Sequence, residues 1–126
     1  MLDRVFVYGT LQQGQPNHHL VAPFVRHVIP GSIAGTLLDL GTYPGWVEGP
    51  GTVHGQVLHL LSPQLALPQL DDLEDYLGPR HPANLYHRVV VKVRTPAGES
   101  RAWAYRYAAS TTTAVILPGG RWPASP

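Results

Sequence analysis

The sequence predicts an α+β fold, a small mixed or antiparallel β-barrel with one or two flanking helices. Short apolar or alternating runs recur between turn residues, which is typical of many short strands. Gly and Pro number 13 each while charged residues make up 13% of the chain, a composition that favours a turn-rich β protein over a helical bundle. One segment near Leu70 shows helical periodicity. At 126 residues the chain has room for one core, so residues 1–126 are expected to form a single domain.

The first predicted strand is the apolar run Val5–Tyr8, which ends at Gly9. The stretch 9–17 holds two glycines and a proline and is predicted to be a loop, followed by a short helical turn over His18–Phe24. Because loops at the ends of strands commonly carry functional groups, this loop is the first place to look for a site.

Three further strands are predicted at Arg26–Ile33, Thr36–Leu40 and Val53–Leu61. Turn signals at Tyr43-Pro44-Gly45 and Gly49-Pro50-Gly51 are expected to separate them.

A helix is predicted to start at Ser62-Pro63, a good N-cap and first-turn pair. Pro68 lacks a backbone N–H, so a kink or restart is expected before Gln69. The helix is expected to end before Gly78-Pro79.

The last hairpin is predicted from two alternating runs, Tyr86–Arg94 and Arg101–Tyr107, joined by a turn over Thr95–Glu99. The segment Leu117–Trp122 has no periodicity and is expected to be irregular.

Composition excludes several function classes. The formal net charge is +1 and no basic run forms a patch, so neither nucleic acid nor an anionic membrane is an expected partner. Cysteine is absent, which excludes disulfides, thiolate nucleophiles and thiolate metal sites. The start of the chain lacks a signal-peptide pattern, and no apolar run is long enough to cross a bilayer, so a cytoplasmic location is expected.

Motif searches narrow the chemistry further. Gly9 and Gly14 have P-loop spacing, but Gln15-Pro16 follows where Lys and Ser or Thr are required. No Gly-x-Ser-x-Gly motif marks a serine nucleophile. The seven histidines lack metal-ligand spacing, so no metal site is expected.

Glu74 is the strongest candidate for a catalytic group. In a helix, Leu70, Leu73 and Leu77 share a face, and Glu74 lies roughly 40° from Leu70. Its acidic neighbours lie roughly 100°, 140° and 200° from Leu70 and are expected to point toward solvent: Asp71, Asp75 and Asp72. A carboxylate held against apolar surface acquires the raised pKa that a general base needs. The plainer alternative is a solvated glutamate at the helix edge.

Several segments together resemble the gamma-glutamylcyclotransferase-like family, most closely its gamma-glutamylamine cyclotransferases. The resemblance begins with Val5–Leu11 followed by Gly14–His18. It continues in the family's order through five more segments: Tyr43–Gly45, Val53–Val57, Leu70–Glu74, Leu85–Val89 and Ala102–Tyr105.

The resemblance implies a mixed β-barrel with flanking helices and an enzyme that releases 5-oxoproline from a small γ-glutamyl substrate without a cofactor. It implies one glutamate as the proton acceptor, and the matching residue is Glu74. It also implies substrate-binding residues in the first loop and the last hairpin: Tyr8, Gly9, Thr10, Leu11 and Tyr105. Tyr8 and Tyr105 could equally be core residues. Arg88 matches a family feature, and we expect it to be a structural partner of backbone or an acid.

Two departures from the family pattern bear on activity. Gln12-Gln13 stands where relatives commonly carry basic residues, and Pro68 lies close to the acidic helix. The alternative functions are a non-catalytic small-molecule-binding β-barrel and a nucleic-acid-binding barrel, the latter disfavoured by the charge. No motif encodes the leaving amine or the oligomeric state.

Overall fold

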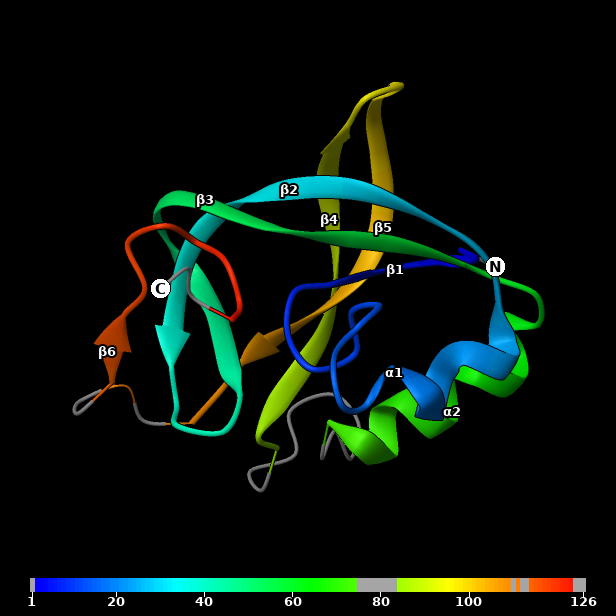
Figure 1. Ribbon diagram of the computed structural model, residues 1–126, viewed down its shortest axis with the longest axis horizontal. Coiled ribbons are helices and arrows are strands. Elements are labelled where there is room, and N and C mark those ends of the chain that lie inside the picture. The colour runs from blue at the N-terminus through cyan, green and yellow to red at the C-terminus, as the bar shows by residue number, and fades with distance from the viewer. Residues whose placement is uncertain (1, 75–83, 110, 112–113, 124–126) are drawn as a thin grey trace.

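A computed structural model of the chain describes residues 2–74, 84–109, 111 and 114–123. Its strands form one six-stranded mixed sheet, with two short α-helices and a 3-10 turn packed at one end (Figure 1). In chain order the elements are β1 (Arg4–Val7), α1 (His18–Val21), η1 (Ala22–Phe24), β2 (Val25–Asp39), β3 (Pro44–Leu60), α2 (Pro63–Leu73), β4 (Tyr86–Thr95), β5 (Gly98–Tyr107) and β6 (Val115–Ile116). The predicted α+β class with a mixed sheet and flanking helices is confirmed.

The sheet curls so that its strands form a ring. β1 pairs with β3, β3 with β2, β2 with β4, β4 with β5, and β5 returns to β1. Two of these junctions are narrow: Ser32 with Arg94 joins β2 to β4, and Val5 with Trp103 joins β1 to β5. The sheet is therefore a ring of strands close to the predicted barrel, without full pairing at every junction.

β2 and β3 are single long strands, and here the sequence prediction was wrong. Arg26–Ile33 and Thr36–Leu40 are joined within β2 through a register shift between Ala34 and Thr36. Gly35 has φ of 139° at this shift, and a Cβ on it would overlap the Trp46 indole. The glycine thus bends the strand without ending it.

The expected turns at Tyr43-Pro44-Gly45 and Gly49-Pro50-Gly51 fall almost entirely inside β3 for a related reason. Gly49 and Gly51 have φ of 154° and 106°, and they lie across from the irregular part of β2. Glycines that look like turn signals in the sequence therefore serve a bend shared by two strands.

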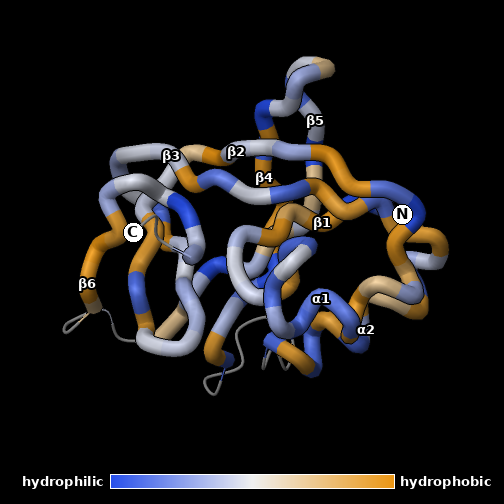
Figure 2. The backbone as a smooth tube through the Cα atoms, in the orientation of Figure 1, coloured by the Kyte–Doolittle hydropathy of each residue, from blue (hydrophilic) through white to orange (hydrophobic). Residues whose placement is uncertain are grey.

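The remaining strand predictions are confirmed within a few residues. β1, the helical turn of α1 and η1, and the β4–β5 hairpin all occur where expected. β6 was missed because two residues carry no periodicity; it pairs with β2 at Leu38 and Asp39. It is hydrophobic and exposed (Figure 2).

α2 continues through Pro68 as one helix, so the expected restart before Gln69 does not occur. Pro68 lies on the exposed side of the helix, so the carbonyl of exposed Gln64, which loses its helical donor, can bond water. Ser62 and Pro63 occupy the predicted N-cap and first-turn positions, although the serine hydroxyl makes no capping bond. No helix in the described ranges is long and apolar enough to span a membrane.

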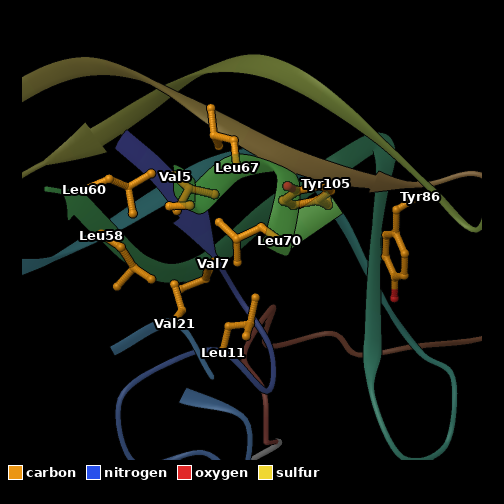
Figure 3. Packing of buried hydrophobic residues seen from close by; sticks show 11 residues of the cluster. Val5, Val7, Leu11, Val21, Leu58, Leu60, Leu67, Leu70, Tyr86 and Tyr105 are labelled. Atoms are coloured by element: carbon orange, nitrogen blue, oxygen red, sulfur yellow. The ribbon is translucent and has the colours of Figure 1, made fainter. Parts of the chain in front are cut away.

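Two buried clusters lie on opposite sides of β1, because its side chains alternate. Val5 and Val7 pack with Leu67 and Leu70 of α2 and with Val21 of α1 (Figure 3). Phe6 and Tyr8 belong to the cluster on the other side. The first cluster fixes α1 and α2 against the sheet, which positions the end of α2.

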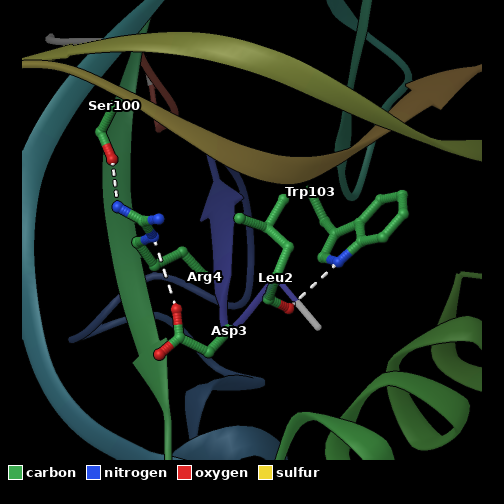
Figure 4. Close-up of polar contacts among 5 residues, drawn as sticks. All are labelled: Leu2, Asp3, Arg4, Ser100 and Trp103. Atoms are coloured by element: carbon green, nitrogen blue, oxygen red, sulfur yellow. Dashed lines mark hydrogen bonds and ion pairs between the residues drawn. The ribbon is translucent and has the colours of Figure 1, made fainter.

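Polar contacts hold the start of β1 against β5 (Figure 4). Arg4 Nη1 donates to Ser100 Oγ at 2.6 Å, and Trp103 Nε1 donates to the Leu2 carbonyl at 3.3 Å. Asp3 lies 3.5 Å from Arg4 Nε. These contacts fix the start of β1 against β5. The loop that follows the other end of β1 therefore begins from a strand that is held in place.

Candidate active site

Tyr8 follows β1 with its ring in the core. Its hydroxyl donates to the Tyr105 carbonyl at 2.6 Å and accepts from the Trp46 N–H at 3.2 Å. Burial raises the pKa of the Tyr8 hydroxyl, and the negative charge of Glu74 raises it further. The hydroxyl therefore stays protonated and joins β5 to β3, while the residue still lines a cavity.

The loop after Tyr8 is shaped by bonds to its own carbonyl groups. The Gln12 N–H donates to the Gly9 carbonyl at 3.1 Å, and the Asn17 N–H donates to the Thr10 carbonyl at 3.0 Å. His18 Nδ1 lies 2.8 Å from the Leu11 carbonyl. Among hydrogen bonds between described residues, none uses the N–H of Gly9, Thr10 or Leu11 as donor. These three amides are thus available to a ligand.

Gly9 permits a close approach between the loop and β3. A Cβ at this position would lie 2.8 Å from both Cγ and Cδ of Pro44. Only glycine allows the chain to pass the proline ring at this distance. The contact brings the loop amides and the start of β3 to the same cavity.

Glu74 is the C-cap of α2, and its N–H still donates to the Leu70 carbonyl at 3.0 Å. The residues of α2 that are buried are Ala66, Leu67 and Leu70. At about 100° per residue, Glu74 falls between Leu67 and Leu70, within this face. Leu73 was expected there too, but it is 45% exposed and lies at the edge. Asp75 and Leu77 lie outside the described residues.

The prediction that Asp71 points toward solvent was wrong. Its Oδ1 accepts from the Tyr105 hydroxyl at 2.7 Å and lies 3.0 Å from Arg88 Nε. The Arg88 guanidinium also lies 4.4 Å from the centroid of the Trp103 ring. The expectation that Arg88 is a structural partner of an acid is confirmed. Asp71 thereby ties the end of α2 to β4 and β5, one turn before Glu74.

A cavity of about 400 Å³ joins these parts. All six residues predicted for the site line it: Tyr8, Gly9, Thr10, Leu11, Glu74 and Tyr105. Its volume is at the small end of the range for ligand pockets, which suits a metabolite-sized molecule.

Three buried tyrosines line the cavity, Tyr8, Tyr86 and Tyr105. Burial raises the pKa of Tyr105, as does its bond to Asp71, and burial raises the pKa of Tyr86. The charge of Glu74 contributes in the same direction to Tyr8, Tyr86 and Tyr105. The negative charge of Glu74 therefore helps to keep these three hydroxyls protonated.

Sequence reasoning missed Asp71 and Tyr86. Tyr86 donates its hydroxyl to the Pro44 carbonyl at 2.7 Å and packs edge-on against Tyr107. Its place in the segment Leu85–Val89, one of those that carry the family resemblance, was the available signal. Gln12 and Gln13 have structural contacts: Gln12 Nε2 donates to the Trp122 carbonyl, and the Gln13 N–H donates to Gln56.

Comparisons with known proteins identify the family of the chain. A family model described as gamma-glutamyl cyclotransferase, AIG2-like, matches residues 5–124. The chain is 34% identical over 107 residues to gamma-L-glutamyl-butirosin B gamma-glutamyl cyclotransferase of Niallia circulans, covering 84% of this chain and 67% of that protein. It is 36% identical over 130 aligned positions to a putative gamma-glutamylcyclotransferase of Vibrio cholerae, covering 97% and 96%.

A solved structure with a similar fold is that of YkqA from Bacillus subtilis. The TM-score is 0.74 at 26% sequence identity, and the match covers 97% of this chain. It covers 40% of the YkqA chain, so this chain spans less than half of that protein.

Proposed function

The chain belongs to the gamma-glutamyl cyclotransferase, AIG2-like family, and from that membership we propose that it releases 5-oxoproline from a γ-glutamyl amine or γ-glutamyl peptide. Glu74 serves first as general base and then as general acid. The observation that carries the proposal is that Glu74 and the loop Tyr8–Leu11 line one cavity. A proton acceptor and a set of amide donors thus face the same bound molecule.

The nucleophile in this reaction is the α-amine of the substrate. At neutral pH this amine is an ammonium, so the Glu74 carboxylate removes a proton before attack. The nitrogen then bonds to the γ-carbonyl carbon and closes a five-membered ring. The bond from that carbon to the departing nitrogen breaks as Glu74 returns its proton to that nitrogen. The ring nitrogen then loses its second proton to the regenerated Glu74 carboxylate, which passes it to the departing amine, so the products are a neutral lactam and an ammonium. No water and no cofactor enters the balance.

The loop amides support two parts of this chemistry. The N–H groups of Gly9, Thr10 and Leu11 can hold the α-carboxylate and the developing oxyanion. Holding both ends of the γ-glutamyl chain folds it back on itself before reaction, which removes the entropic cost of ring closure from the chemical step.

The test is incubation of the purified protein with a panel of γ-glutamyl amines and peptides, with products identified by mass. The proposal predicts equal amounts of 5-oxoproline and free amine. In water enriched in heavy oxygen, the 5-oxoproline should carry no label, because the attacking atom is nitrogen. Release of labelled glutamate would show hydrolysis and refute the proposal, as would the absence of any product.

A further inference from the structure

The cavity has an inner end and an outer end with different chemistry. The inner end holds Glu74, Tyr86, Tyr105 and the loop amides. The outer end is marked by residues that line the cavity and are also exposed to solvent, since such residues must stand at its mouth. They are Pro16, Asn17, Leu20, Thr42 and Leu73.

Two leucines from different helices dominate this mouth. Leu20 of α1 is 40% exposed, and Leu73 of α2 is 45% exposed. A single exposed leucine is ordinary on a protein surface, but two that border one cavity form an apolar contact surface. Pro16 and the half-buried Tyr43 and Leu85 extend it.

Neither leucine is required by the core. α1 is anchored by its neighbour Val21, which is 1% exposed, and α2 is anchored by Leu67 and Leu70, which are 3% and 2% exposed. Val21 packs in the same cluster as these two residues, so the two helices are held together independently of Leu20 and Leu73. The leucines are thus free to contact a ligand.

We propose that the departing amine carries an apolar alkyl or aryl group that lies against Leu20 and Leu73. The substrate class is then a γ-glutamyl amide of a hydrophobic primary amine. This inference rests on the proposed function. The γ-glutamyl half occupies the inner end with its α-amine toward Glu74, and the departing half points out through the mouth.

The charge of the mouth favours the same class. Among the described residues that line the cavity, Glu74 is the one charged side chain. Asn17 is polar, but its Nδ2 already donates to Thr10 Oγ1 at 3.1 Å. Among the described lining residues, a carboxylate on the departing group would meet no cation and a second ammonium would meet Glu74 alone, while either would lose water against the leucines.

The test compares γ-glutamyl amides of straight-chain amines from methylamine to hexylamine, with the γ-glutamyl derivatives of glycine and putrescine as charged comparators. We expect kcat/KM for 5-oxoproline release to rise about threefold for each methylene that contacts the mouth. Both charged comparators should react more slowly than the butylamide.

Matched variants assign the effect to the mouth. Leu73→Ser should lower kcat/KM for the hexylamide about five- to tenfold and leave the methylamide within about twofold. Leu65→Ser is the control, because Leu65 lies on the same helix, is 60% exposed and does not line the cavity. It should leave the whole series unchanged.

Three outcomes would overturn the inference. A rate of 5-oxoproline release that is independent of chain length would refute the proposed role of the mouth while leaving the proposed reaction intact. An equal loss of kcat/KM in Leu65→Ser and Leu73→Ser would do the same. Release of 5-oxoproline from none of the amides would refute the proposed reaction itself.

Discussion

Asp71 and Glu74 stand one turn apart on the same helix, in contrasting surroundings. Asp71 is held by Arg88 and Tyr105 and does not line the cavity, whereas Glu74 does line it. A carboxylate fixed against a guanidinium holds elements of the structure together. A carboxylate that reaches a ligand cavity can exchange a proton with what binds there. The contrast supports our proposal that Asp71 anchors the helix and Glu74 takes part in the chemistry.

Glu74→Gln is the largest change that this contrast predicts. The amide has nearly the shape of the carboxylate but cannot accept a proton, so kcat for 5-oxoproline release should fall by about 10² to 10⁴. The midpoint of thermal unfolding should stay within about 2 °C of the parent protein. Turnover within tenfold of the parent would assign the proton transfer to another group.

Asp71→Asn should instead act on stability. It removes the negative charge that lies 3.0 Å from Arg88 Nε, and the two side chains are 21% and 18% exposed, so the cost should be about 2 to 3 kcal/mol. Urea unfolding measures this. The control is Asp72→Asn, the exposed neighbour, which should be nearly neutral. Equal stability of the two variants would remove the anchoring role from Asp71.

Gly9→Ala tests the loop that faces Glu74. Its Cβ would lie 2.8 Å from the Pro44 ring, so the loop must shift. The shift should lower the free energy of unfolding by about 1 to 3 kcal/mol and should also lower kcat/KM. Gly119→Ala is the control, because its Cβ would meet nothing within 4 Å. Parent-like activity of Gly9→Ala would show that the close approach to Pro44 is dispensable.

Tyr105→Phe should have the smallest effect at neutral pH, about 1 kcal/mol for the lost bond to Asp71. Burial raises the pKa of Tyr105 above its ordinary value near 10, so the folded state keeps a proton that the unfolded chain loses at higher pH. The parent's stability from this residue is therefore complete below pH 10 and declines above it.

The stability of the parent relative to Tyr105→Phe should consequently fall by about 1.4 kcal/mol between pH 8 and pH 11, which is enough to reverse the sign of the difference. Reversible urea unfolding at pH 8 and at pH 11 measures it. A difference that stays constant between these two conditions would contradict a buried, protonated Tyr105.

The sequence alone predicted the position of Glu74 on its helix better than it predicted the groups around Glu74. Its place beside Leu70 holds, although the buried face is defined by Ala66 and Leu67 and excludes Leu73. Asp71 could not be read correctly, because the groups that turn it inward, Arg88 and Tyr105, come from strands far along the chain. Helical periodicity describes one helix and carries no information about its partners.

The fold class was predictable from composition and alternation, while the strand boundaries were not. Glycines at 35, 49 and 51 have the same local signature in a turn and in a bend shared by two strands, and only the pairing of β2 with β3 decides between them. The donor role of the loop amides could not be predicted either, because the sequence does not show which N–H groups the loop leaves unused.

The most direct test of the division between the two carboxylates is a crystal structure of Glu74→Gln with an intact γ-glutamyl amide bound. We expect the α-nitrogen of the substrate within about 3.2 Å of the side chain at position 74, and the γ-carbonyl oxygen facing the N–H groups of the loop Tyr8–Leu11. A substrate nitrogen directed at Asp71, or a substrate bound outside the cavity that Glu74 shares with Gly9, would contradict the account.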